Sequence, residues 1–517
     1  MAQEQRQESR VKTVSLIVVI TLVGKVLGLV RDMLLGHNFA TGMESAAFQV
    51  ASRIPRTFFD AIFASAISAS FIPVFSERLE KQGQEDAYSL SRSFFTWVGL
   101  LTAAFSLLGM AFADPVVALL ADGFDQETAA LCAALLRILF PTVFFTGLAF
   151  SMVGVLQSMG QFYIPAALSV ASNGVIILYY LFFCRKFGIY GLAWAFLLGW
   201  AVQAVMQIPW LRRHGFRYRI SFRHPGLKSV FVLMLPVMVS TWVQPVNQLI
   251  STRFATHLFE GAGASAMDYA NTLYTMLAGI LVLSITNVIF PEMSRLSTTN
   301  QTRELGELIS GSLRGMLFLL LPMTVGLMLM AEPLVRLLYQ WGSWEDYSTA
   351  ITARALMFMS VGMVGYGVQN VLSRLFYAEQ DGKTPLISGA ISVIINVILC
   401  LALADRLDVA GLSLATAVSV TAAAIVLLVP TIRRYPGVLN REFWLGLLKM
   451  CLCTGIMSLA VWGVSLLLPD GWKIGLVGRV LDLGVPAAIG VIVYFAAALI
   501  LRLPELDVVK RKLKRGT

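Results

Sequence analysis

The chain has 517 residues, of which 57% are hydrophobic and 14% charged, and its formal net charge is +10. This composition excludes an ordinary soluble protein, because soluble domains carry about 25% charged residues and single cores stop growing near about 250–300 residues. The apolar residues come in blocks of about 20 or more, long enough to cross a hydrocarbon core of roughly 30 Å. We therefore expect a polytopic membrane protein.

In chain order, the apolar blocks predict about fourteen transmembrane helices and an all-α fold. They are too long for strands and lack period-two alternation, and a membrane barrel would need alternating segments of about ten residues. The first block contains Lys25 and Arg31 and lacks a cleavage site, so we interpret it as a retained helix rather than a signal peptide. The predicted helices cover residues 12–36, 43–74, 92–121, 127–157, 162–184, 188–211, 228–258, 265–293, 311–340, 347–378, 384–404, 410–432, 443–468 and 476–502.

The second part of the chain repeats motifs of the first in the same order and at a nearly constant offset. "ADPVVALL" near the end of the third predicted helix returns as "AEPLVRLL" near the end of the ninth. A fixed period predicts duplicated units, and each unit here holds six helices, so both enter the membrane in the same direction. Parallel repeats imply a pseudo-two-fold axis along the membrane normal and a transporter with its substrate site near the midplane. The matched pairs are Pro73 with Pro291, Pro115 with Pro333, Pro165 with Pro385 and Gly191 with Gly411.

These repeats predict three parts of the chain. Residues 1–215 form an N-terminal six-helix lobe, residues 216–437 form a C-terminal six-helix lobe, and residues 438–517 hold helices 13 and 14 with a basic tail. About 25 basic residues fall in the connections on one side of the predicted helices and about five on the other. The positive-inside rule therefore places both termini in the cytoplasm. The positive charge is spread over separate loops, so we do not expect a nucleic-acid partner.

The first predicted helix carries three ionisable groups inside an apolar run: Lys25, Arg31 and Asp32. Charged groups at bilayer depth are costly and usually face a cavity or a partner. Lys25 and Asp32 share a helix face, whereas Arg31 points elsewhere. Because the neighbours Arg31 and Asp32 do not face each other, we expect each to need another partner.

The second predicted helix adds Arg53, Arg56 and Asp60 on one stripe, at spacing i, i+3, i+7. The two helices together offer four cations against two anions. This excess indicates a cavity that accepts a negatively charged ligand, and arginine suits phosphate through its planar fork. The alternative is that the charges only neutralise one another in the packing, as Arg56 and Asp60 at i, i+4 would do, or extend to the interface.

Several segments resemble the MurJ (MviN) family, the lipid II flippases of bacterial peptidoglycan synthesis, which share a superfamily with MATE exporters and oligosaccharide-lipid flippases. The segments include "GKVLGLVRD" in the first helix, "SRIPRTFFDAIFASAISASFIPVFSE" in the second and "RLFYAEQDGKTP" after the tenth. The resemblance covers most of helices 1–12 and implies a V-shaped cavity with cations on helices 1, 2 and 8. It also implies a groove for the polyprenyl tail on helices 13 and 14.

Carried over by position, the resemblance gives Lys25, Arg31, Asp32 and Arg53 as substrate-binding residues. Two positions depart from the family pattern, since Phe59, followed by Asp60, and Thr272 stand where members carry cations. The cavity is therefore less cationic than expected for the family. Two further cations are candidates to compensate, and they are Arg56 and Arg253.

Residues and resemblance together predict a multi-pass transporter of the bacterial cytoplasmic membrane. It moves undecaprenyl-pyrophosphate-linked lipid II from the inner to the outer leaflet by alternating access through a cationic central cavity. The alternatives are a flippase for another polyprenyl-linked oligosaccharide, and a membrane glycosyltransferase or ligase, which the short outward loops disfavour. We expect no enzyme activity, no cofactor and no metal. No P-loop motif is present, so we also expect no nucleotide. The membrane potential or an ion gradient would then drive transport.

Overall fold

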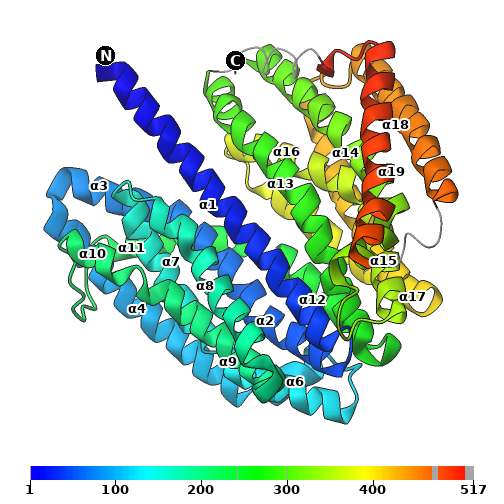
Figure 1. Ribbon diagram of the computed structural model, residues 1–517. Coiled ribbons are helices and arrows are strands. Elements are labelled where there is room, and N and C mark those ends of the chain that lie inside the picture. The colour runs from blue at the N-terminus through cyan, green and yellow to red at the C-terminus, as the bar shows by residue number, and fades with distance from the viewer. Residues whose placement is uncertain (1, 242, 300, 469–474, 507–517) are drawn as a thin grey trace. The chain divides into compact units, whose positions relative to one another are not determined.

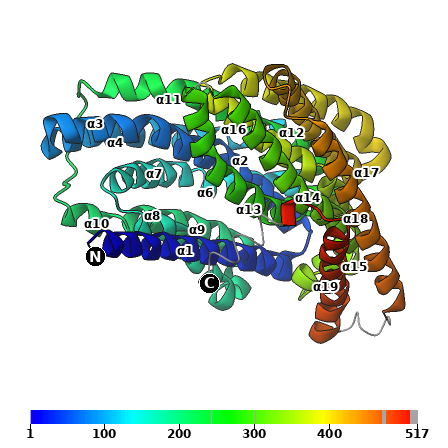
Figure 2. The same cartoon turned by 90° about the horizontal axis from the view of Figure 1, so that it is seen from above.

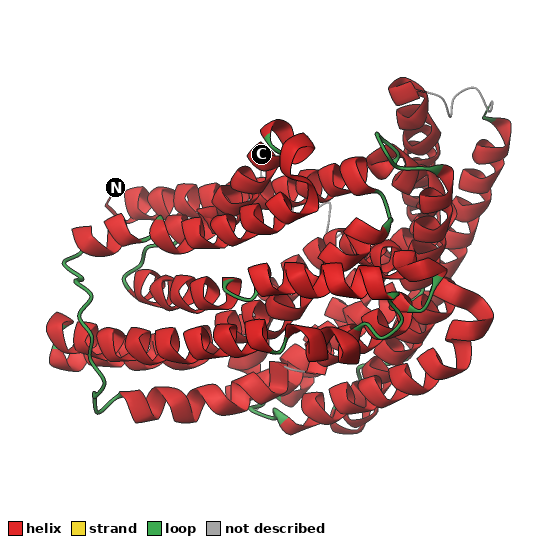
Figure 3. Cartoon of the chain, turned by 90° about the horizontal axis from the view of Figure 1, so that it is seen from below, coloured by secondary structure: helices red, strands yellow, loops and turns green. Residues whose placement is uncertain are grey.

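The protein is described by a computed structural model covering residues 2–241, 243–299, 301–468 and 475–506. Within these ranges, the side chains of residues 2–15, 57–66, 68–69, 236, 239–241 and 243–244 lie outside the description. Every regular element of the described chain is a helix, as Figure 3 shows. Nine helices of this part of the chain are long and apolar enough to cross a membrane, or ten if the pair bent by 47° after Ser360 is one span. The predicted all-α membrane fold is confirmed, while the count of fourteen spans stays a prediction.

The chain forms two compact units, residues 1–265 and 266–517. Residues 216–265 contact the first unit, because α11 packs on α2 and on the π-helix η1. The boundary of the predicted lobes at residue 215 follows from the sequence repeat instead, and it stays a prediction. The helices of the first unit (blue to green in Figure 1) are α1 (Ala2–Phe39), α2 (Met43–Ala66), η1 (Ile67–Phe71), α3 (Ile72–Gln82), α4 (Gln84–Ala111), α5 (Ala113–Leu120), α6 (Gln126–Leu139), α7 (Thr142–Ser158), α8 (Tyr163–Phe182), α9 (Cys184–Val205), α10 (Ile208–Arg213), α11 (Leu227–Thr241), α12 (Val243–Thr256) and the 3-10 turn η2 (Phe259–Gly261).

In the first unit, α1 lies along α8, as Figure 2 shows. Gly24 permits this approach, since a Cβ at that position would lie 3.1 Å from the Cβ of Ser169. Small residues at this contact thus bring polar side chains of α8 within reach of α1.

A hydrophobic core of the first unit lies where η1 and α4 meet. The rings of Phe71 and Phe94 are stacked there, with 4.7 Å between their centroids.

The described part of the second unit consists of five long helices and one shorter pair, α15 and α16. α18 packs on α19, and both contact α14. The hydroxyl of Tyr494 donates a hydrogen bond of 2.6 Å to the carbonyl of Phe318, which joins α19 to α14. The helices are α13 (Ala262–Thr298), α14 (Thr302–Tyr339), α15 (Asp346–Ser360), α16 (Met363–Ala378), α17 (Lys383–Arg434), α18 (Arg441–Leu467) and α19 (Gly475–Ile500).

The backbone carries the repeat that the sequence predicts. Asp408 interrupts α17 with φ 52° and ψ −135°, and Gly188, at the equivalent position of the first repeat, interrupts α9 with φ 52° and ψ −146°. Each break separates two predicted helices. The turns before α8 and α17 also match, because Gln161 N–H donates to Leu156 O and Asp381 N–H donates to Phe376 O, both at 2.8 Å. The same positive-φ geometry recurs at one further pair of equivalent positions, Gly160 with Gln380.

Candidate functional site

Arg31 lies at a junction of three helices in the first unit. Its Nε and Nη2 donate hydrogen bonds of 2.9 and 2.8 Å to Oδ1 of Asp32, and its Nη1 donates to Oδ1 of Asn173 on α8 at 3.2 Å. The guanidinium also lies 5.3 Å from the ring centroid of Phe196 on α9. Only 17% of the Arg31 side chain is exposed, so these three neighbours, and not water, make most of its contacts.

The expectation that Arg31 and Asp32 would not pair was wrong. Helical neighbours point about 100° apart at Cβ, but the arginine stem is long enough to bend its guanidinium back to the adjacent carboxylate. Asn173 completes the arrangement, since its Nδ2 donates to the carbonyl of Gly24 at 3.1 Å. Arg31 therefore connects α1 to α8 in addition to carrying a charge.

Lys25 differs from Arg31 in its surroundings. Its side chain is exposed, and among the residues that the structure describes no hydrogen bond or ion pair involving its ammonium group occurs. An ammonium group in an apolar helix needs water or an anion to offset its desolvation. Of the predicted cations on α1, Lys25 is the one open to a ligand.

Arg53 connects α2 to α12. It is partly buried, and its Nη1 donates a hydrogen bond of 2.6 Å to Oγ1 of Thr252. The Thr252 hydroxyl in turn donates to the carbonyl of Gln248 at 2.9 Å. Arg56, one turn further along α2, is exposed. The Asp60 side chain lies outside the described residues, so its predicted pairing with Arg56 stays a prediction.

Arg253 forms an ion pair at the end of α12. Its Nε and Nη2 donate to the two carboxylate oxygens of Asp122 at 3.1 and 2.5 Å, and Nε2 of His257 lies 3.0 Å from the same carboxylate. The hydrogen bond from Arg253 holds the pKa of Asp122 below its ordinary value, with a smaller contribution in the same direction from His257. The charge of Arg253 is therefore balanced by a partner in the loop after α5.

The sequence reasoning missed the partners of these cations. Asn173 and Thr252 each accept a hydrogen bond from an arginine, and Asp122 accepts two. Asn173 alone carried a signal, because an amide inside the apolar run "LSVASNGVIILYY" indicates a hydrogen bond between helices. Within the described residues, no group of three or more histidine, cysteine, aspartate or glutamate side chains is arranged to hold a metal ion.

Comparison with known proteins shows a family and a fold. Residues 35–481 match the family described as lipid II flippase MurJ. A probable lipid II flippase MurJ of Rhizobium meliloti is 29% identical over 515 residues, covering 96% of this chain and 95% of the relative. The lipid II flippase MurJ of Burkholderia cenocepacia is 30% identical over 72% of this chain and 74% of its own length.

Two solved structures share the fold. A lipid II flippase MurJ in an inward closed conformation has a TM-score of 0.81 at 23% identity, with 96% of this chain and 99% of that chain covered. A MATE family multidrug resistance transporter of the MOP superfamily, in an inward-facing conformation, has a TM-score of 0.70 at 16% identity, with 82% and 98% covered. At these identities the likeness is one of fold alone.

Proposed function

The chain belongs to the MurJ family of lipid II flippases, and on that premise we propose that it carries lipid II from the inner to the outer leaflet of the cytoplasmic membrane. The observation that carries this proposal is the family match over residues 35–481, together with relatives that align along nearly the whole chain. The protein is a multi-pass membrane transporter and not an enzyme. Both termini are proposed to lie in the cytoplasm, from the distribution of basic residues in the connections.

The cations of α1 and α2 support a phosphate-bearing substrate. A flippase must keep a sugar–pyrophosphate headgroup out of hydrocarbon while the polyprenyl tail stays in it. Lys25 offers an exposed ammonium group to a pyrophosphate as a point charge. Arg53 and Arg56 add two guanidinium groups one helical turn apart on α2. We assign Lys25, Arg53 and Arg56 to headgroup binding, and Arg31 to the packing that positions α1.

Transport is proposed to proceed by alternating access, driven by the membrane potential or by an ion gradient. Each charge that crosses the membrane is worth about 2.3 kcal/mol per 100 mV. The sequence holds no P-loop motif, so the proposal includes no nucleotide. No cofactor enters the proposed cycle.

The test is complementation of a bacterium depleted of its own lipid II flippase. The chain is expressed, and the lipid II exposed on the outer leaflet is measured with a probe that cannot cross the membrane. We expect exposure to be restored. Normal membrane insertion without restored exposure would reject lipid II as the substrate and favour another polyprenyl-linked oligosaccharide.

Substitutions in the same assay separate binding from folding. Lys25→Gln is expected to lower exposure at least about tenfold, because one charge-assisted contact to phosphate is lost, while the amount of inserted protein stays unchanged. Arg433→Gln is the matched control, because it removes one exposed positive charge at the end of α17, in a connection that the charge distribution predicts to be cytoplasmic. Equal activity of the two variants would reject the role of Lys25.

A further inference from the structure

The segment between α10 and α11, residues 214–226, runs without regular structure along the surface of α4; we call it the strap. Its backbone is tied to α4 by side chains of that helix. Tyr88 donates a hydrogen bond of 2.6 Å to the carbonyl of His214, Arg92 donates one of 2.9 Å to the carbonyl of Arg217, and Trp97 donates one of 3.0 Å to the carbonyl of Phe222. These bonds follow α4 for two and a half turns, so the strap is a fixed part of the first unit.

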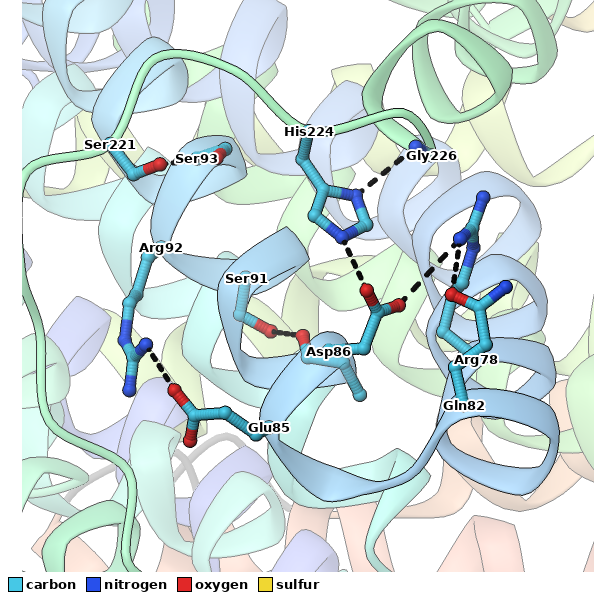
Figure 4. A network of polar contacts seen from close by, with 11 residues as sticks. Arg78, Gln82, Glu85, Asp86, Ser91, Arg92, Ser93, Ser221, His224 and Gly226 are labelled. Atoms are coloured by element: carbon cyan, nitrogen blue, oxygen red, sulfur yellow. Dashed lines mark hydrogen bonds and ion pairs between the residues drawn. The ribbon is translucent and has the colours of Figure 1, made fainter.

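Side chains fix the far end of the strap, as Figure 4 shows. The hydroxyls of Ser93 and Ser221 are hydrogen bonded at 2.9 Å. Nε2 of His224 lies 3.2 Å from Oδ1 of Asp86, whose other oxygen is 3.6 Å from Nη1 of Arg78. The strap is therefore anchored to α4 at this end too, and Arg78 of α3 contacts the same carboxylate as His224.

An apolar groove of about 1000 Å³ lies between the strap and the helices. Its walls come from α4, α7, α10 and the strap. Gly99 of α4 lies against the Leu148 and Phe144 side chains of α7, since a Cβ there would be 3.8 and 3.9 Å from them. On the strap, Tyr218 and Ile220 line the groove while 53% and 71% exposed. Because the hydrogen bonds of the strap hold this apolar surface exposed, it needs an apolar partner.

Two arginines line the same groove, Arg212 at the end of α10 and Arg217 on the strap. The turn between them is closed by hydrogen bonds of Gly215 N–H to Arg212 O and of Phe216 N–H to Leu211 O, both at 3.0 Å. Both arginine side chains are exposed, and no hydrogen bond or ion pair of their guanidinium groups occurs within the described residues. The groove thus presents two cations to a ligand, one on each side of this turn, in an otherwise mostly apolar lining.

The length of the groove matches one leaflet. Arg92, which bonds to the Arg217 carbonyl, and Ala103, which lines the groove, are eleven residues apart on α4. At 1.5 Å per residue they are separated by roughly 17 Å, close to half of the roughly 30 Å hydrocarbon core. A ligand with an anionic group beside Arg217 and an extended chain reaching Ala103 has the dimensions of a membrane phospholipid.

We propose that this groove binds one anionic glycerophospholipid, with an acyl chain between the strap, α4 and α7 and the phosphate against Arg212 and Arg217. Charge complementarity selects an anionic headgroup, because basic residues near the membrane surface attract anionic lipids. The site lies wholly in the first unit and does not involve Lys25, Arg53 or Arg56, so it is separate from the proposed transport site.

The test measures lipid binding to the purified full chain by native mass spectrometry. Phosphatidylglycerol and phosphatidylcholine with identical acyl chains are titrated into the delipidated protein. We expect one tightly retained phosphatidylglycerol per chain and weaker phosphatidylcholine. Arg212→Gln/Arg217→Gln should weaken phosphatidylglycerol about tenfold or more and phosphatidylcholine less, because the choline group already balances the charge of its phosphate. The control Arg213→Gln/Arg219→Gln removes the same charge from exposed arginines that do not line the groove and should have little effect.

The apolar part of the groove is tested separately. Ala103→Trp should fill it and weaken both lipids, whereas Ala104→Trp, on an exposed neighbouring position outside the groove, should not. Equal retention of the two lipids, or equal loss in the two arginine pairs, would overturn the proposal. Displacement of phosphatidylglycerol by a slight excess of lipid II would show that the substrate is the occupant and would also overturn it. Because the arginine variants lie on the surface, this result does not depend on whether Ala103→Trp folds.

Discussion

Replacing Asp32 by asparagine would remove the anion that two nitrogens of Arg31 contact, while keeping the shape of the side chain. The side chains of Arg31 and Asp32 are 17% and 18% exposed. The pair thus lies between a surface pair, worth about 0–1 kcal/mol, and a buried pair, whose disruption costs about 3–5 kcal/mol. We expect Asp32→Asn to lower the free energy of unfolding by about 2 kcal/mol, because Asn173 and Phe196 still contact the guanidinium.

The assay is thermal unfolding of the purified chain in detergent, followed by tryptophan fluorescence. A loss of this size corresponds to a fall of about 4 °C in the unfolding midpoint for a unit of roughly 250 residues. Glu77→Gln is the control, because it removes one partner of a pair whose Glu77 and Lys81 side chains are 58% and 70% exposed, and it should change the midpoint little. If Asp32→Asn is no less stable than Glu77→Gln, Arg31 does not depend on Asp32. The double variant Arg31→Gln/Asp32→Asn should recover part of the loss, since no unpaired charge remains.

Three further changes concern the end of α12. Thr252→Val should lower stability by about 1–3 kcal/mol, as measured by chemical unfolding, because Nη1 of the partly buried Arg53 loses the Thr252 hydroxyl as an acceptor. The pKa of Asp122 is held below 3.8 chiefly by Arg253. The resulting stabilisation is therefore complete above 3.8 and lost as the pH falls through the lowered pKa, so Asp122→Asn should flatten the acid limb of a stability–pH curve. Gly123→Ala should cost about 1–3 kcal/mol in thermal unfolding, because its Cβ would lie 2.6 Å from the carbonyl carbon of Thr256 at the end of α12.

Matched controls accompany these variants. Thr275→Val removes a hydroxyl that bonds only to carbonyls of its own helix and should have a smaller effect than Thr252→Val. Gly174→Ala places a Cβ with no atom within 4 Å and should be neutral or stabilising. If each control matches its variant, the contacts at α12 do not contribute to stability. An acid limb unchanged by Asp122→Asn would assign the pH dependence to another carboxylate.

The sequence predicted the helices and the repeat because both depend on local or periodic signals. Apolar blocks of membrane length specify helices, and the offset between the repeated motifs reappears in the backbone at Gly188 and Asp408. A break within the predicted helix 127–157 was not predicted: α6 ends at Leu139 and α7 begins at Thr142, after Pro141. A proline within an apolar run was a local signal for that break.

The partners of the charged groups could not be predicted, because they come from distant parts of the chain. Arg31 and Asn173 are 142 residues apart, and Arg53 and Thr252 are 199 apart. One sequence without relatives carries no information on such pairs, and a polar residue in an apolar run indicates only that a partner exists. Helix periodicity also misled the prediction for Arg31 and Asp32, because it describes the direction of Cβ and not the reach of a long side chain.

The contacts of each cation therefore decide how a loss of transport should be interpreted. Lys25 is exposed and without a described partner, so neutralising it removes a charge and no contact. Arg31 holds Asp32, Asn173 and Phe196 together. Its replacement leaves a carboxylate in an apolar helix and loosens α1 from α8. A transport defect in Arg31→Ala is thus expected even if the guanidinium never contacts the substrate. Only a variant that is inactive yet as stable as the parent chain identifies a cation that binds the headgroup, and Lys25→Gln is the variant for which the structure predicts that combination.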